Sequence, residues 1–423
     1  MRYKINNNKK FIYDLAWNYI SIFVLAVGGL LFSVIIMLFY DAATLGIFNS
    51  IYAYYIVLSQ ISVLGIHMSV LKSVSSEAEK NKEYLNILSS AIVMGVIISI
   101  GVSIALVIIY ITIFYKSNII ALRNIWVIIP ALPLFSLNKI ILSYFNGRAM
   151  MKAYAFFQAF RNLAITGSLL ILAFISVQGQ YLALSFFCAE FILCLSMSTY
   201  VLKVERKLVI PNIHWMRKHI RFGVHSMPGN LILELNSKID IVCLGLILKN
   251  DNLIGYYSFA AVFVEGFYQL YVVVRRNLNP LIARYYENGL VSEEFVQLKQ
   301  KVASVIRMIA IPLVIIIALC YYIVCIFFNK QEYLQVILPL IIMCISIAVT
   351  GKYIVWGNLL NQTGYPAMES LVNTIAAASN FLLNLIFIAN YGLNGAAIAT
   401  ACSYIVFAVV LSVIVKRKLH INL

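Results

Sequence analysis

The stretch LNILSSAIVMGVIISIGVSIALVIIYITIF, residues 85–114, decides the fold class. It runs for 30 residues without an acidic or basic side chain. A helix needs about 20 predominantly apolar residues to cross the roughly 30 Å hydrocarbon core of a bilayer. The strands of a transmembrane barrel are much shorter and alternate in polarity. The stretch therefore predicts a transmembrane helix.

The same apolar character extends over the whole chain of 423 residues. Hydrophobic side chains make up 62% of the sequence, charged side chains make up 11%, and the mean hydropathy is +0.91. Soluble domains carry roughly a quarter of charged residues, so this composition excludes a soluble fold. The sequence predicts an all-α polytopic membrane protein with about 12 transmembrane helices. Windows of about 19 residues place them at Asp14–Phe39, Leu45–Leu71, Leu85–Phe114, Ile125–Phe145, Ala153–Ser176, Tyr181–Leu202, Phe222–Leu248, Leu253–Val274, Val302–Phe328, Tyr333–Leu360, Ala367–Ala389 and Asn394–Val415.

The basic residues are distributed unevenly between the two sets of alternate loops. One set, together with the two terminal segments, carries most of them, whereas the other set holds Lys116, Arg123, Lys249 and Lys330. Loops rich in Lys and Arg stay on the cytoplasmic side of a membrane. We therefore expect a multi-pass protein with both termini in the cytoplasm.

The formal net charge of +16 also has an explanation in the membrane. Basic residues next to transmembrane helices face anionic lipid head groups, so we expect no nucleic acid partner. All seven cysteines lie in predicted spans and form no C-x-x-C pair, which argues against a disulfide framework and against a metal site. We expect no cofactor and no metal ion.

The longest hydrophilic stretch between predicted spans separates them into two groups of six. It predicts an N-terminal lobe of residues 1–202, a cytoplasmic linker of residues 203–221 and a C-terminal lobe of residues 222–423. Because each lobe has an even number of helices, any internal repeat must be parallel rather than inverted. The turn Tyr40–Phe48 of the first lobe weakly resembles the corresponding turn Lys249–Tyr257 of the second lobe, as a parallel repeat would require.

Several short motifs resemble those of a known superfamily. Lys238–Asp240, Ile254–Ser258 and Asn279–Pro280 resemble the start of the second lobe in polysaccharide exporters. Asn380–Asn384 and Asn390–Thr400, which reads NYGLNGAAIAT, resemble the penultimate helix and the G-x-x-G-A-A-x-A-T pattern of the O-antigen flippases. These flippases belong to the multidrug, oligosaccharidyl-lipid and polysaccharide exporter superfamily. The small residues of the last motif also allow close helix packing in lipid, whatever the function.

The resemblance implies a carrier whose two lobes enclose a central cavity and open it alternately to the two sides of the bacterial inner membrane. Its cargo would be an undecaprenyl-pyrophosphate-linked oligosaccharide, such as an O-antigen or another surface polysaccharide repeat unit used for lipopolysaccharide. The polymerase and chain-length components of the same pathway would be its protein partners. The resemblance implies no enzymatic activity.

Cations inside predicted spans are candidates for binding such a cargo. An ionised Lys or Arg near the bilayer centre costs about 2.5–3.5 kcal/mol, so it is a functional candidate by default. A diphosphate cannot enter a low-dielectric cavity unpaired, and Lys or Arg donors would pair it. The substrate-binding candidates are Lys139, Arg161, Lys238 and Lys352, with Trp356, which lies four residues after Lys352 and could stack on a sugar. Snorkelling to the interface is the alternative role of Lys139 and Arg161.

Carboxylates inside predicted spans are candidates for coupling transport to an ion gradient. The candidates are Glu234, Asp240 and Glu265. Glu265 has no basic residue within one helical turn on its own helix and is the preferred coupling carboxylate. Glu234 precedes Lys238 by four residues, so a self-neutralising pair is the alternative role of these two side chains.

Two other functions remain open. A multidrug or cation antiporter of the same superfamily would select positive cargo with carboxylates, whereas cations are at least as numerous inside these spans. A membrane-embedded polysaccharide polymerase or ligase would need a catalytic apparatus. The loops show no Ser-His-Asp set, no glycine-rich phosphate loop and no metal-ligand cluster.

Overall fold

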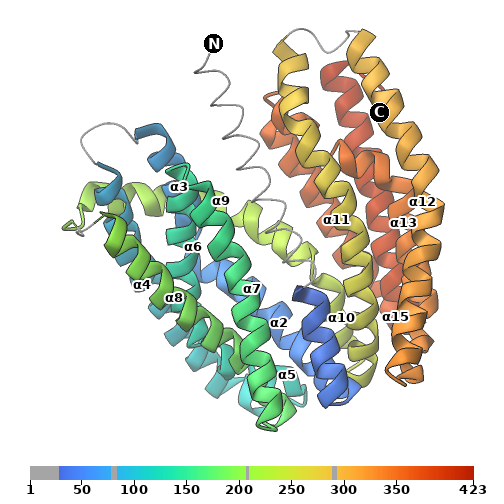
Figure 1. Cartoon of the computed structure of the whole chain (residues 1–423), viewed down its shortest axis with the longest axis horizontal. Helices are drawn as coiled ribbons and strands as arrows, with labels where there is room; N and C mark the ends of the chain where they lie inside the picture. The colour runs from blue at the N-terminus through green and yellow to red at the C-terminus, as the bar shows by residue number, and fades with distance from the viewer. Residues whose placement is uncertain (1–27, 78–82, 206–208, 288–292) are drawn as a thin grey trace. The chain divides into compact units, whose positions relative to one another are not determined.

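The computed structural model describes residues 28–77, 83–205, 209–287 and 293–423, and every regular element in those ranges is a helix (Figure 1). Within the same ranges, nine helices are long and apolar enough to cross a membrane. The predicted all-α polytopic membrane fold is therefore confirmed.

The chain forms two compact units, Met1–Leu231 (unit 1) and Ile232–Leu423 (unit 2). The boundary between them falls inside α9 (Ile213–Asn236). The predicted linker, residues 203–221, thus contains the end of α8 and the first part of α9. The division into two lobes and a linker stays a prediction.

Unit 1 is a bundle in which α6 (Ala131–Gly147) is the central helix. It packs against α2, α3, α4, α7 and α8. Its fully buried Ile140 meets Leu88 of α4 and Leu193 of α8 in one apolar cluster. The other described elements of this unit are the helical segment Gly28–Phe39, α2 (Ala42–Val63), α3 (Ile66–Glu77), α4 (Glu83–Thr112), η1 (Phe114–Lys116), α5 (Ile120–Arg123), η2 (Ile125–Ile128), α7 (Met151–Phe174), η3 (Gly179–Tyr181) and α8 (Leu184–Glu205).

Unit 2 is organised around α13 (Ile337–Val355). This helix packs against α11, α12 and α15, and α10 packs against α15. The elements of this unit after α9 are α10 (Ile239–Ile247), α11 (Asp251–Glu287), α12 (Glu293–Phe327), η4 (Gln331–Val336), α14 (Leu359–Gln362) and α15 (Pro366–Leu419).

Two helices present apolar faces that nothing within their own unit covers. On α4, Ile97, Ile104 and Ile108 recur on one face and are about half exposed, as are Ile315 and Leu319 on α12. A soluble protein rarely exposes a continuous apolar patch of this kind. These faces are the surfaces that the lipid chains would contact.

Twelve spans were predicted, whereas the described residues contain nine membrane-length helices, and the difference arises at three places in the chain. The first predicted span begins outside the described residues, and only Gly28–Phe39 of it is described, as helix. The seventh contains Pro228 and is divided between α9 and α10. The last two lie within α15, where Gly392, at φ 56° and ψ −128°, interrupts the helical backbone.

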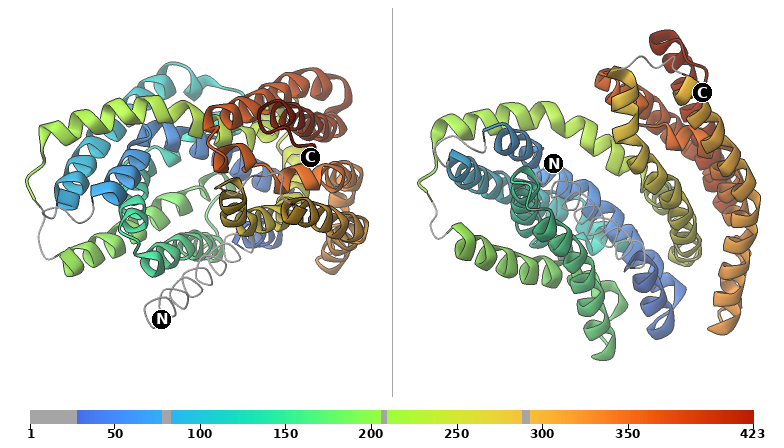
Figure 2. Two further views of the ribbon diagram at one scale, coloured as in Figure 1. Left: turned by 90° about the horizontal axis from the view of Figure 1, so that it is seen from above. Right: turned by 45° about the horizontal axis from the view of Figure 1, so that its top comes forward.

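The first part of α9 crosses the break between α2 and α3 at very short range. The break lies at Leu64 and Gly65, which both have positive φ. A Cβ atom on Gly223 would lie 2.3 Å from the Leu64 carbonyl oxygen, and one on Gly65 would lie 2.6 Å from the Gly223 oxygen. Figure 2 shows this part of α9 running across the helices of unit 1 rather than along them. The crossing requires glycine at both positions.

Candidate functional site

Unit 2 encloses a cavity of about 310 Å³, which we call the unit-2 cavity. It is lined by residues from α9, α10, α11, α13 and α15 and by Lys238, which lies between α9 and α10. Polar side chains occupy much of its wall. Those used below are Asn236, Lys238, Asp240, Glu265, Asn380 and Thr400.

Asp240 holds the most connected carboxylate of the unit-2 cavity. Thr400 Oγ1 donates to its Oδ2 at 2.6 Å and Tyr257 Oη donates to the same oxygen at 3.2 Å. Asn384 Nδ2 donates to its Oδ1 at 2.8 Å. All three donors are neutral, so these hydrogen bonds leave the negative charge uncompensated.

A second layer of amides supports Asp240. Asn384 Nδ2 lies 3.0 Å from Asn380 Oδ1, and Asn380 Nδ2 donates to Asn236 Oδ1 at 3.3 Å. Carboxylate, amide and hydroxyl oxygens are the ligands that hard cations prefer. The arrangement can hold a proton or a small hard cation. The described residues contain no group of three or more His, Cys, Asp or Glu side chains that could hold a metal ion.

The break between α9 and α10 positions this site. α9 ends at Asn236, Lys238 is the N-cap of α10, and Asp240 lies in the first turn of α10. Discontinuous helices form the substrate and ion sites of many secondary transporters, because free backbone groups then line the cavity. This break interrupts the predicted seventh span, whereas α9 continues through Pro228.

Lys238 and Glu265 face each other across the unit-2 cavity wall. Lys238 Nζ lies 3.4 Å from Glu265 Oε2, and their side chains are 15% and 56% exposed. The structure thus brings a predicted substrate cation and the preferred coupling carboxylate into one ion pair. Glu234, the other predicted coupling residue, is half-buried on α9 and lies outside the cavity lining.

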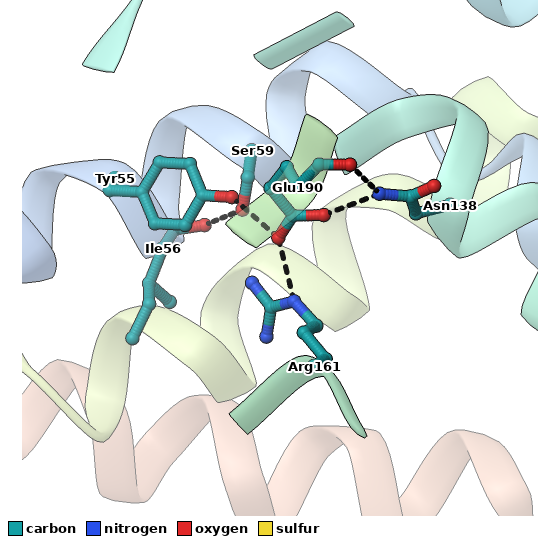
Figure 3. Close-up of polar contacts among 6 residues, drawn as sticks. All are labelled: Tyr55, Ile56, Ser59, Asn138, Arg161 and Glu190. Atoms are coloured by element: carbon teal, nitrogen blue, oxygen red, sulfur yellow. Dashed lines mark hydrogen bonds and ion pairs between the residues drawn. The ribbon is translucent and has the colours of Figure 1, made fainter. Parts of the chain in front are cut away.

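Unit 1 contains a second polar cluster, around Glu190 of α8 (Figure 3). Arg161 Nε of α7 lies 2.6 Å from Glu190 Oε1, and Tyr55 Oη of α2 donates to the same oxygen at 2.9 Å. Asn138 Nδ2 of α6 donates to Oε2 at 2.7 Å and to the Glu190 carbonyl oxygen at 2.9 Å. We call these four residues the Glu190 cluster.

Lys139 and Arg161 of the Glu190 cluster both contact the aromatic ring of Phe135. Its Nζ lies 5.8 Å from the centroid of Phe135, and the Arg161 guanidinium lies 5.2 Å from the same centroid. A cation within about 6 Å of a ring face gains a cation–π interaction. The two predicted substrate cations of unit 1 therefore lie around one ring.

Lys352 and Trp356 are not among the residues that line the unit-2 cavity. Lys352 Nζ donates to the main-chain oxygen of Leu423 at 3.4 Å and lies 4.5 Å from the ring centroid of Tyr353. The Trp356 side chain is 2% exposed and packs edge-on against Phe295. Trp356 is the C-cap of α13, so the helical periodicity that predicts a shared face ends there.

Sequence reasoning did not assign the partners of the two central carboxylates. Tyr55, Asn138, Tyr257 and Thr400 each bond a carboxylate on another helix. Of these four residues, Thr400 lies in the motif Asn390–Thr400, which carried only the family resemblance. Contacts between helices leave no periodic trace within either helix.

The fold defines a class, the all-helical multi-pass membrane proteins whose fold is like that of two-lobed transporters. The structure is similar to that of a lipid II flippase, MurJ, in an inward closed conformation, with a TM-score of 0.71, 17% identity and coverage of 96% of this chain and 87% of that one. It is also similar to an inward-facing multidrug resistance MATE family transporter of the MOP superfamily, with a TM-score of 0.73, 12% identity and coverage of 95% and 94%. A MOP superfamily transporter from Pyrococcus furiosus gives a TM-score of 0.58, 12% identity and coverage of 96% and 94%.

The sequence defines the family more closely than these structures do. The family model described as polysaccharide biosynthesis protein matches residues 13–286. The chain belongs to the polysaccharide biosynthesis protein family. A search of curated proteins gives no match to this sequence.

Proposed function

We propose that the protein is a flippase for lipid-linked oligosaccharides. It moves undecaprenyl-pyrophosphate-linked repeat units of an O-antigen or a similar surface polysaccharide from the cytoplasmic to the periplasmic leaflet of the bacterial inner membrane. The family match over residues 13–286 carries this proposal. The fold shared with a lipid II flippase and a MATE transporter supports an alternating-access mechanism.

The membrane-embedded cations fit an anionic cargo. Arg161 and Lys139 gather around Phe135 in unit 1, and Lys238 lies on the wall of the unit-2 cavity. A diphosphate gains charge-assisted hydrogen bonds from such donors, which replace the water that it loses. We assign cargo contact to these three cations, with the positive-inside loops and both termini in the cytoplasm.

Asp240 is the coupling residue in this proposal. Its carboxylate faces neutral donors, whereas Glu265 is already paired with Lys238. A carboxylate held this way gains from binding H⁺ or Na⁺, and its charge state would bias the shape of the α9–α10 break. Cation entry from the periplasm would then drive the outward movement of cargo.

The test begins with deletion of the gene in its host. We expect loss of surface polysaccharide and accumulation of lipid-linked repeat units on the cytoplasmic face. The wild-type gene and a Lys352→Ala variant should restore the polymer, because Lys352 lies outside the cavity lining. Lys238→Ala should fail to restore it at equal membrane abundance.

Normal surface polysaccharide in the deletion strain, with no second flippase gene, would overturn the proposal. A multidrug or cation antiporter would then become the leading function, and the same strain should be tested for sensitivity to cationic drugs. A polymerase or ligase predicts a different defect, in which single repeat units reach the periplasmic face and are not joined.

A further inference from the structure

The carboxylate of Glu190 is fully enclosed within the described part of unit 1. The residue is 0% exposed, and each of its oxygens accepts a hydrogen bond from a different helix. Arg161 supplies the positive charge in this cluster, through Nε. A buried charge persists only when paired and hydrogen-bonded, so the cluster is a complete solvation shell for the carboxylate.

Arg161 holds the Glu190 carboxylate through Nε, one of its three guanidinium nitrogens. Its Nε bonds Glu190 Oε1 at 2.6 Å, and the two terminal amino groups lie beyond Nε on the same guanidinium, with the Tyr55 hydroxyl close by (Figure 3). The side chain is 22% exposed, in contrast to its carboxylate partner. A guanidinium offers five donors in a fixed fork, and the terminal amino groups suit two oxygens of a phosphate.

Lys139 is a second cation beside the Arg161 guanidinium, because both side chains contact the ring of Phe135. Lys139 and Arg161 lie around its ring at 5.8 Å and 5.2 Å from the centroid. Two cations and one carboxylate leave this region with one positive charge. A diphosphate approaching the Arg161 terminal amino groups would therefore feel both an attraction and the opposing charge of Glu190 behind them.

We propose that Glu190 is a positioning residue and resident counter-charge of a diphosphate site formed by the terminal amino groups of Arg161. It holds the guanidinium through Nε so that the fork faces the cargo. It also limits the affinity of the site, so that the bound diphosphate is released after the membrane is crossed. The identity of the anion rests on the proposed flippase function.

The negative charge of Glu190 can be removed without changing the size of its side chain, because the surrounding residues can also bond an amide. In Glu190→Gln the amide oxygen can still accept from Tyr55 and Arg161. Asn138 Oδ1 is buried without a partner in the described part of the chain, so a turned Asn138 amide can accept from the new NH₂ group in exchange for its hydrogen bond to the Glu190 carbonyl oxygen. The substitution should remove the counter-charge and keep the packing.

A second substitution should have the opposite effect and increase the compensation of the Arg161 charge by Glu190. Tyr55→Phe removes the hydroxyl that shares Glu190 Oε1 with Arg161, and it keeps the aromatic contacts with Phe186 and Phe135. Oε1 then interacts with Arg161 alone and compensates its charge more fully. A site weakened by misfolding would change in the same direction in both variants, whereas the proposal predicts opposite directions.

The experiment measures binding of inorganic pyrophosphate to the purified full-length protein in lipid nanodiscs. We expect Glu190→Gln to bind pyrophosphate ~10-fold more tightly and to flip lipid-linked cargo more slowly, because the opposing charge is lost. Tyr55→Phe should bind it several-fold more weakly. The matched control is Glu205→Gln on the same helix, whose carboxylate bonds the Tyr144 hydroxyl, and it should bind like the wild type.

Unchanged or weaker binding by Glu190→Gln at wild-type thermal stability overturns the inference. If that variant does not fold, unchanged or tighter binding by Tyr55→Phe overturns it instead. Absence of saturable pyrophosphate binding in the wild type also overturns it. Normal polysaccharide in the deletion strain, together with the expected binding shifts, would overturn the flippase function and leave the diphosphate site standing.

Discussion

The Lys238 ammonium lies 3.4 Å from the Glu265 carboxylate, although 27 residues separate the two in the chain. The two side chains, one at the α9–α10 break and one on α11, line the same cavity. Glu265 is 56% exposed, and ion pairs of this kind contribute roughly 0–1 kcal/mol to stability. The pair therefore sets the charge of the unit-2 cavity more than it stabilises the fold.

Neutralising Lys238 should impair transport with little loss of stability. Lys238→Met leaves Glu265 as an uncompensated anion in a cavity that must accept a diphosphate. We expect flipping to fall at least ~10-fold, since the unpaired Glu265 carboxylate would repel the diphosphate, while the unfolding free energy changes by under about 1 kcal/mol. Flipping of lipid-linked repeat units in proteoliposomes and thermal unfolding measure the two effects.

The double variant Lys238→Met/Glu265→Gln separates two roles of the cation. If Lys238 contacts the cargo, the neutral cavity stays defective. Recovery of wild-type flipping by the double variant would mean that Lys238 serves only to neutralise Glu265, and our assignment of cargo contact would then be wrong.

Replacing Asp240 should uncouple transport from the ion gradient. Asp240→Asn keeps the size of the side chain and can still accept from Thr400, Tyr257 or Asn384 at its amide oxygen. We expect flipping that no longer responds to an imposed H⁺ or Na⁺ gradient, because the neutral amide cannot change charge. Asp251→Asn at the start of α11 is the matched control. A gradient response equal to that of the wild type in Asp240→Asn would assign coupling elsewhere.

Most of the fold could be predicted from composition and hydropathy. Long apolar runs such as residues 85–114 become membrane-length helices because the backbone must satisfy its own hydrogen bonds in lipid. The interruptions were harder to place. The breaks at Gly65 and Gly392 depend on positive φ values, and Gly65 is also required by a close approach of α9.

The site was predictable only one helix at a time. Lys238, Asp240 and Glu265 were singled out because ionisable groups are costly in a membrane, and the structure brings all three to the unit-2 cavity. The i,i+4 rule describes contacts along one helix. It could not predict the ion pair between Arg161 and Glu190, because these two residues lie 29 positions apart on adjacent helices.

Adding one methyl group at Gly223 should destabilise unit 1. The Cβ of Gly223→Ala would lie 2.3 Å from the Leu64 carbonyl oxygen, so α9 must move away from the α2–α3 break. Overpacking of this kind costs typically about 1–3 kcal/mol. Thermal unfolding should show a lower Tm than that of Gly229→Ala on the same helix, where nothing lies within 4 Å of the added carbon. Equal Tm values would show that the crossing is looser than described.

His219, which precedes the predicted seventh span, anchors α9 through both ring nitrogens. Its Nε2 lies 3.1 Å from the Ile87 carbonyl oxygen, so it is the donor, and Nδ1 then accepts from the Ser69 hydroxyl at 2.9 Å. The residue is 0% exposed. Burial, with the nearby Lys218 charge, lowers the pKa of His219 to about 4, against the hydrogen bond to Ile87, which raises it. The neutral imidazole is therefore the form that fits.

Stability should fall as the pH drops from about 6.5 to about 4. In that window the unfolded chain binds a proton at this imidazole and the folded chain does not, so protonation favours unfolding. Above about pH 6.5 both states are neutral and the full contribution is present, at most about 3 kcal/mol. His219→Gln keeps a donor and an acceptor but cannot titrate. The Tm of the wild type should therefore decrease more steeply than that of His219→Gln between pH 7.5 and pH 5, while carboxylates affect both proteins alike. Parallel Tm curves would mean that the pKa of His219 is the same in the folded and unfolded chains, and the burial argument would then be wrong.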